Sequence, residues 1–253
     1  ELELQLTNAP HMLDRYDALV LLKGISIEKK RDILLKVLDK EKHEGMINEV
    51  ISQLCLDQTE KTQARLIKFL SFNKAITRDH VLKSLTVTPL NKSAFISALS
   101  DSSYDVVKTA LEKLCLAYPN EAANYLNITK DVHGMFHTVR MKWLELSLLN
   151  NINAESAKNE LVEYSSKAYE FRTRGQAFIV LKSTSTCNEQ VAANLFQAIL
   201  SPNGRLSGPA IELCNHFGNS VFYREILKKV YDSSSFLESE KEILSRSVHA
   251  LKN

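Results

Sequence analysis

The sequence predicts an all-α fold in which antiparallel helix pairs stack into a solenoid. Three observations support this prediction: glycine and proline are scarce, apolar residues recur with the helical period, and a short segment repeats along the chain. The 253 residues include only 7 glycines and 5 prolines, which favours long helices with short turns over many short strands. With 44% hydrophobic and 25% charged residues, the chain can bury a core and should not be disordered.

The repeated segment has the form basic-x-x-Ala-apolar-x-x-Leu, and in the copy at 107–114 the basic residue Lys108 stands one position later. The small alanine suits a position where two helices approach closely. Clear copies cover residues 15–22, 107–114 and 174–181, and weaker copies cover 65–69, 140–144 and 210–214. The anchor positions are therefore 18, 68, 110, 143, 177 and 210. The later steps of about 33 residues leave room for two helices and two turns, and the longer early steps leave room for extra helices. Such repeats predict a HEAT-like α-α superhelix with a concave surface.

Partner helices are expected between the anchors. Apolar side chains follow a period of 3.6 residues within 27–38, 46–54, 154–162 and 191–199. Helix breaks are expected at Gly24, Pro89, Pro119, 202–204 and Gly218.

The first residues have a different pattern. Polar and apolar residues alternate from Glu1 to Leu6, as they do in a half-buried strand. We therefore expect residues 1–8 to be a strand-like remnant of an upstream domain, and residues 9–253 to form the helical repeat domain.

Charge, hydropathy and cysteine spacing exclude several classes. The formal net charge is only +2, with acids and bases interspersed, so nucleic acid is not expected as a partner. No apolar run approaches the length of a transmembrane helix. The cysteines are far apart and form no CxxC pair, which favours reduced thiols in the core. They are Cys55, Cys115, Cys187 and Cys214.

No local motif predicts a catalytic or metal-binding residue in this chain. His133 and His137 have a spacing that zinc can use, but Gly134 stands where the zinc-protease motif needs a glutamate general base. His43 and Glu44 begin like that motif, and Ile47 then stands in place of its second histidine. The sequence also contains no nucleophile elbow and no phosphate-binding glycine loop.

The candidate binding residues are arginines beside aromatic side chains. Arg172 and Arg174 open a predicted helix directly after Tyr169, and an arginine fork can bind a carboxylate of a peptide or of an acidic partner. The alternative is a solvated helix entry in which these arginines pair with local acids such as Glu170. Arg140 is a weaker candidate of the same kind.

One segment resembles a known family. Residues 8–19 read Asn-Ala-Pro-His-Met-Leu-Asp-Arg-Tyr-Asp-Ala-Leu, which is similar to the junction that opens the C-terminal helical domain in the aminopeptidase N family of zinc metallopeptidases. The motif covers about a dozen residues, and Arg-x-x-Ala-Leu is common in helical repeats generally. In that family a small β-domain precedes the junction. The catalytic zinc site lies farther upstream, so no family catalytic residue maps onto this chain.

The resemblance implies a non-catalytic domain that acts as lid and scaffold over the active-site cleft of an upstream catalytic domain. This chain would hold no cofactor, and zinc would belong to the parent protein. The partners would then be the catalytic domain and the peptide substrate. The rival hypothesis is an independent HEAT-like scaffold that binds another protein.

Overall fold

The computed structural model describes residues 1–251, and in this range all regular structure is helical. The chain divides into two compact units, residues 1–129 and residues from 130 onward. The all-helical structure of the described residues confirms the predicted all-α fold class. No helix in the described range is both long and apolar enough to cross a membrane.

Unit 1 contains nine α-helices and three short 3-10 helices. Several helices begin and end where punctuating residues were expected, for example at Gly24 and Pro119. The helices are α1 (Leu2–Asn8), α2 (Met12–Leu21), η1 (Leu22–Gly24), α3 (Ile27–Lys40), α4 (Glu44–Leu54), α5 (Glu60–Ile67), η2 (Lys68–Ser71), α6 (Ala75–Ser84), α7 (Lys92–Ala98), α8 (Tyr104–Ala117), η3 (Pro119–Glu121) and α9 (Ala122–Ile128).

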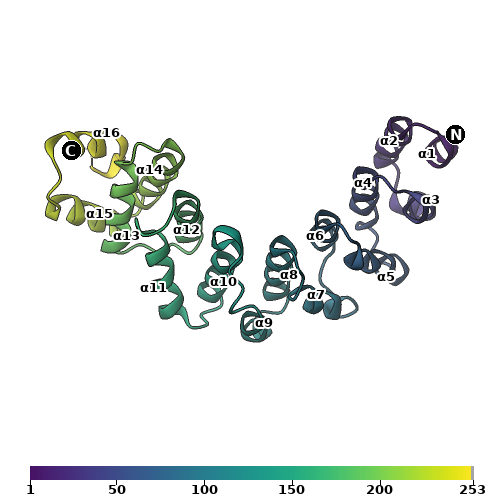
Figure 1. Cartoon of the computed structure of the whole chain (residues 1–253), viewed down its shortest axis with the longest axis horizontal. Coiled ribbons are helices and arrows are strands. Elements are labelled where there is room, and N and C mark those ends of the chain that lie inside the picture. Colours follow the sequence, from purple (N-terminus) through teal and green to yellow (C-terminus); the bar gives the residue numbers. More distant parts are fainter. Residues whose placement is uncertain (252–253) are drawn as a thin grey trace. The chain divides into compact units, whose positions relative to one another are not determined.

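Alternate helices of unit 1 form one layer of the stack. Within this layer α2 packs on α4, α4 packs on α6 and α6 packs on α8, and the order can be followed along the ribbon in Figure 1. The helices between them pack on their neighbours in the chain, α3 on α4 and α7 on α8. The layer helices therefore bury their apolar faces against neighbouring helices of the stack, as a helical repeat requires.

Unit 2 repeats this arrangement. Within it α10 packs on α12 and α12 on α14, while α11 packs on α10 and α12, and α13 on α14. The elements are η4 (Met135–His137), α10 (Thr138–Leu149), α11 (Ala154–Tyr164), α12 (Phe171–Ser183), α13 (Glu189–Ile199), α14 (Gly204–Gly218), α15 (Val221–Ser233), α16 (Glu238–Ser247) and η5 (His249–Leu251).

Most of the predicted anchor positions are buried on these layer helices. They are Ala18 on α2, Ala110 on α8, Trp143 on α10, Ala177 on α12 and Ala210 on α14. The anchor predicted at Lys68 is wrong, because Lys68 is exposed and begins the short helix η2. The matching position is Val81 on α6, which is fully buried and follows Arg78 by three residues.

The predicted strand at residues 1–8 is also wrong. Leu2–Asn8 is the helix α1, which packs on α2 and buries Leu6. The residues of this segment are mainly leucine, glutamate and glutamine, which are strong helix formers. Local propensity and the absence of a partner strand in the described residues therefore outweigh the two-residue alternation.

The four cysteines are free thiols, but the burial expected for all of them is found for only two. Cys115 and Cys214 are buried, while Cys55 and Cys187 are partly exposed. Burial raises the pKa of Cys115 and of Cys187 to about 12, so both thiols stay protonated and unreactive at neutral pH.

A buried carboxylate stabilises the turn between α4 and α5. Asp57 accepts two hydrogen bonds from Arg31, at 2.6 and 2.8 Å, and others from Thr59 and Thr62. Burial alone would raise the pKa of Asp57, but these hydrogen bonds outweigh it and lower the pKa from 3.8 to about 2.

This depressed pKa predicts a pH dependence of folding. The stabilisation is fully present above the unfolded pKa of 3.8 and is lost as the pH falls towards about 2. It amounts to about 2 kcal/mol. We expect Asp57→Asn to destabilise the protein at neutral pH, and the gap to the parent chain to shrink below about pH 4. Urea unfolding of both proteins across this range checks the prediction, and a gap that does not change with pH would contradict it.

Candidate functional site

The predicted binding residues all lie in unit 2, around the start of α10 and the start of α12. Arg140 lies on α10, Tyr169 in the turn before α12, and Arg172 and Arg174 on the first turn of α12. The structure gives them different surroundings, so they do not act as one group.

Arg140 is held by contacts within the protein. Its guanidinium donates to both carboxylate oxygens of Glu160, at 2.7 and 2.6 Å, and to the carbonyl oxygen of Lys130. It also lies 4.0 Å from the centre of the Trp143 ring. Hydrogen bonding to Glu160 raises the pKa of Arg140. Trp143 is buried in the core, as expected. Arg140 therefore has no free fork to offer a ligand.

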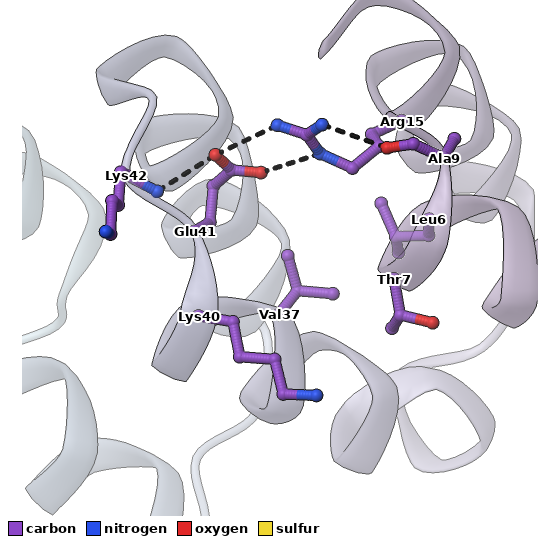
Figure 2. Close-up of a pocket in the computed structure, with 8 residues that line it drawn as sticks. All are labelled: Leu6, Thr7, Ala9, Arg15, Val37, Lys40, Glu41 and Lys42. Carbon is purple, nitrogen blue, oxygen red and sulfur yellow. Dashed lines mark hydrogen bonds and ion pairs between the residues drawn. The ribbon is translucent and has the colours of Figure 1, made fainter. Parts of the chain in front are cut away.

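The contacts of Arg140 belong to a recurring arrangement, which we call an arginine bridge. An arginine in the first turn of a helix donates backwards to main-chain carbonyls and forwards to a carboxylate 20–26 residues later. In Figure 2 the Arg15 guanidinium lies between the carbonyl of Ala9 and the carboxylate of Glu41, beside a cavity of about 270 Å³. Arg78 likewise donates to the carbonyls of Phe72 and Asn73 and to Asp101.

Arg174 has the position of a bridge arginine but lacks the carboxylate. Like Arg15 and Arg78 it is the fourth residue of its helix, and its Nε donates backwards to the carbonyl of Ser165 at 3.0 Å. Forwards, Nη2 donates to the carbonyl of Asn194 at 3.1 Å and to Oε1 of Gln197 at 3.2 Å. Its acceptors among the described residues are all neutral.

Arg172 is the exposed member of the group. Its guanidinium lies 4.6 Å from the centre of the Phe136 ring and 5.5 Å from that of Phe171, distances that permit cation–π attraction. It forms no ion pair with the described acidic residues. The carboxylate of Glu170 accepts from the main-chain N–H groups of Arg172 and Thr173, because it caps α12.

Tyr169 joins an aromatic cluster, defined as His133, His137, Tyr164 and Tyr169. The His137 ring lies 4.7 Å from Tyr164, 5.9 Å from Tyr169 and 5.7 Å from His133, between ring centres. The Tyr169 hydroxyl donates to Glu163. Burial, and then the electrostatic effect of the nearby His133, lower the pKa of His137, so its imidazole is neutral at physiological pH.

A strained turn places His137 in this cluster. Gly134, Phe136 and His137 all have positive φ, at 76°, 52° and 58°. Such angles are uncommon for residues other than glycine. Residues 133–137 therefore do not form the helical His-x-x-x-His face considered from the sequence. No group of three or more metal-ligating side chains occurs among residues 1–251.

Gly134→Ala should destabilise unit 2 by about 1–3 kcal/mol, because alanine at positive φ is strained. The added Cβ would also lie 2.9 Å from Oγ1 of Thr138. The control is Gly175→Ala on α12, where an added Cβ meets nothing within 4 Å. That change should be neutral or stabilising by up to about 1 kcal/mol. The only tryptophan, Trp143, lies in unit 2, so its fluorescence during urea unfolding reads out both variants. Equal changes in stability for Gly134→Ala and Gly175→Ala would contradict the inference that the turn at Gly134 is strained.

The resulting surface presents the Arg172 guanidinium beside aromatic side chains. Arg172 is exposed on its aromatic support, and the neighbouring Met135 is 67% exposed. The sequence singled out Arg172 as a binding candidate and His137 only as one of a zinc-spaced pair, and it missed the contact of Arg172 with Phe136. The available signal was Gly134, which marks a turn just before a helix.

These features define an all-α helical-repeat protein. The sequence matches no model of a protein family and no curated protein. Among solved structures it is similar to the designed armadillo repeat protein YIII(Dq)4CqI, with 13% identity over 99% of this chain and 98% of that chain, and a TM-score of 0.31. A likeness at this level assigns neither a family nor a ligand.

Proposed function

We propose that this chain is a non-catalytic helical domain that acts as lid and scaffold for the catalytic domain of a zinc aminopeptidase-like protein. The junction motif at residues 8–19 suggested this function. A docked upstream domain would need an apolar contact surface on the first helices.

The observation that carries the proposal is an exposed apolar stripe on α2. Leu13 is 67% exposed and Val20 is 39% exposed, and seven residues separate them, so they lie on one helix face. Leu4 on the adjoining helix α1 is 65% exposed. Exposed apolar side chains that share a face support a docking surface for another domain.

The motif residues also have defined structural roles at this end. The chain turns at Ala9 and Pro10, whose carbonyls accept from Arg15, while Ala18 and Leu19 are fully buried. Gln5 on α1 donates to the carbonyl of Asp14 on α2. These contacts fix α1 against α2 and leave Leu13 on the solvent-exposed face of α2.

The first test is the size of the native polypeptide. An antibody raised against this chain should detect a band well above 28.6 kDa in source cells. The immunoprecipitated protein should contain zinc and hydrolyse an aminopeptidase substrate. A band near 28.6 kDa would contradict the lid function.

The docking surface has its own test in the parent protein. Leu13→Lys combined with Val20→Lys should loosen the contact and speed limited proteolysis at the junction. Leu56→Lys is the control, because Leu56 is also 67% exposed but lies outside α1 and α2. Equal proteolysis of the parent protein and the double variant would contradict docking through this stripe.

The second candidate is an independent scaffold that binds an acidic protein segment, and Arg172 favours it. A guanidinium on an aromatic support without a carboxylate partner is available to an anionic group. Arg172→Glu should weaken binding of a fluorescein-labelled acidic peptide in an anisotropy assay. The control Arg205→Glu, at another exposed arginine, should leave binding unchanged.

A further inference from the structure

A solvent-open cavity of about 620 Å³ lies between the α11–α12 turn and α13. Its lining includes Ser166 and Lys167 from the turn, and Gln190, Asn194 and Gln197 from α13. No acidic side chain lines it. Lys167 is exposed and forms no ion pair with the described residues.

The Arg174 guanidinium lies directly behind this lining. Nη2 donates to Asn194 and Gln197, both of which line the cavity, and Nε donates to Ser165, the neighbour of Ser166. Arg174 is only 6% exposed. Burial lowers its pKa, and no acidic group opposes that effect. A buried charge is normally paired, so Arg174 is an exception to a general rule.

The other bridge arginines show what is missing. Each of them binds one carboxylate farther along the chain. Arg15 binds Glu41, 26 residues ahead, Arg78 binds Asp101, 23 residues ahead, and Arg140 binds Glu160, 20 residues ahead. For Arg174 the position 23 residues ahead is Gln197, whose neutral amide oxygen occupies the place of the carboxylate. Gln197 is exposed, so its side chain can leave this place without disturbing the core.

We propose that this cavity binds a peptide carboxylate, which completes the fourth arginine bridge by replacing Gln197 on Arg174. Lys167 adds a second positive charge at the rim, and Gln190 and Gln197 offer amide groups to the peptide main chain. A carboxylate is the expected anion because carboxylates occupy the equivalent place at Glu41, Asp101 and Glu160. The proposal does not depend on whether the chain belongs to a peptidase.

The test uses the full chain and three short peptides with blocked N-termini. One carries a single internal glutamate and an amidated C-terminus, the second replaces that glutamate with glutamine, and the third has only a free C-terminal carboxylate. Binding is followed by NMR at the Arg174 Nε–H and at the side-chain amide of Gln197. We expect saturable shifts with the glutamate peptide and none with the glutamine peptide. Shifts with the third peptide alone would identify a C-terminal carboxylate as the occupant, which equally supports the proposal.

Two substitutions at Gln197 are expected to change peptide binding in opposite directions. Gln197→Glu places a carboxylate of the protein itself on Arg174, so it should abolish binding of the peptide carboxylate. Gln197→Ala removes the competing acceptor and should tighten binding by about threefold or more. Lys167→Gln should weaken binding, more strongly at low salt than at high salt. Both positions are exposed, so folding should persist in all three variants. Shifts of equal, non-zero size with the glutamate and glutamine peptides, no shift with any of the three peptides, or unchanged binding in Gln197→Glu would overturn the proposal.

Discussion

Replacing Arg78 with methionine should lower the free energy of unfolding by about 3–5 kcal/mol, because it leaves the Asp101 carboxylate buried without its cation. The side chains of this pair are only 10% and 13% exposed, and Arg78 also holds the carbonyls of Phe72 and Asn73. Hydrogen bonding to Asp101 raises the pKa of Arg78, which is consistent with a strong mutual interaction. Urea unfolding followed by far-UV circular dichroism measures the change.

The matched control is Arg65→Met in the same unit. Arg65 also pairs with an aspartate, Asp39, but the two side chains are 36% and 49% exposed. An exposed pair contributes little, so the loss should be at most about 1 kcal/mol. Similar losses for Arg65→Met and Arg78→Met would show that the arginine bridge is no more than a surface ion pair.

Phe178→Ala in α12 should destabilise unit 2 by about 3–5 kcal/mol. Phe178 is 2% exposed and lies on the core face of α12 with Ala177 and Leu181. Removing the ring opens a cavity that the neighbouring helices α10 and α14 can fill only in part.

The adjacent residue supplies the control. Ile179 is 59% exposed, so Ile179→Ala should change stability by at most about 0.5 kcal/mol. Trp143 lies on α10, which packs against α12, and its fluorescence follows the unfolding of this region directly. If Ile179→Ala were as harmful as Phe178→Ala, the assignment of the two helix faces would be wrong.

The sequence predicted those features of the fold that depend on residues near one another in the chain. The spacing of Ala110, Trp143, Ala177 and Ala210 located the layer helices, because helical periodicity and small residues are local signals. The same kind of local pattern failed at Leu2–Asn8, where an alternation of leucine and polar residues coincides with strong helix formers. The division near Thr129 has no local signal, because it depends on the distribution of tertiary contacts.

The candidate site was predictable only in part. Arginine beside aromatic residues singled out Arg172 and Arg174 together, with Arg140 as a weaker candidate, but the sequence could not show that only Arg172 is exposed. That distinction depends on partners 20–23 residues away, across a helix–helix contact. The left-handed angles at Phe136 and His137 are set by tertiary packing, since local sterics disfavour them for residues other than glycine.

The arginine bridges also bear on how the chain folds during synthesis. Each bridge joins residues no more than 26 positions apart, so only a short loop must close. Topologies with such local contacts fold fast. At a ribosomal rate of about 5–20 residues per second, Glu41 follows Arg15 within roughly 1–5 s. Each helix pair can therefore close before the next one has been made, and an incomplete chain exposes only the apolar face of its newest pair.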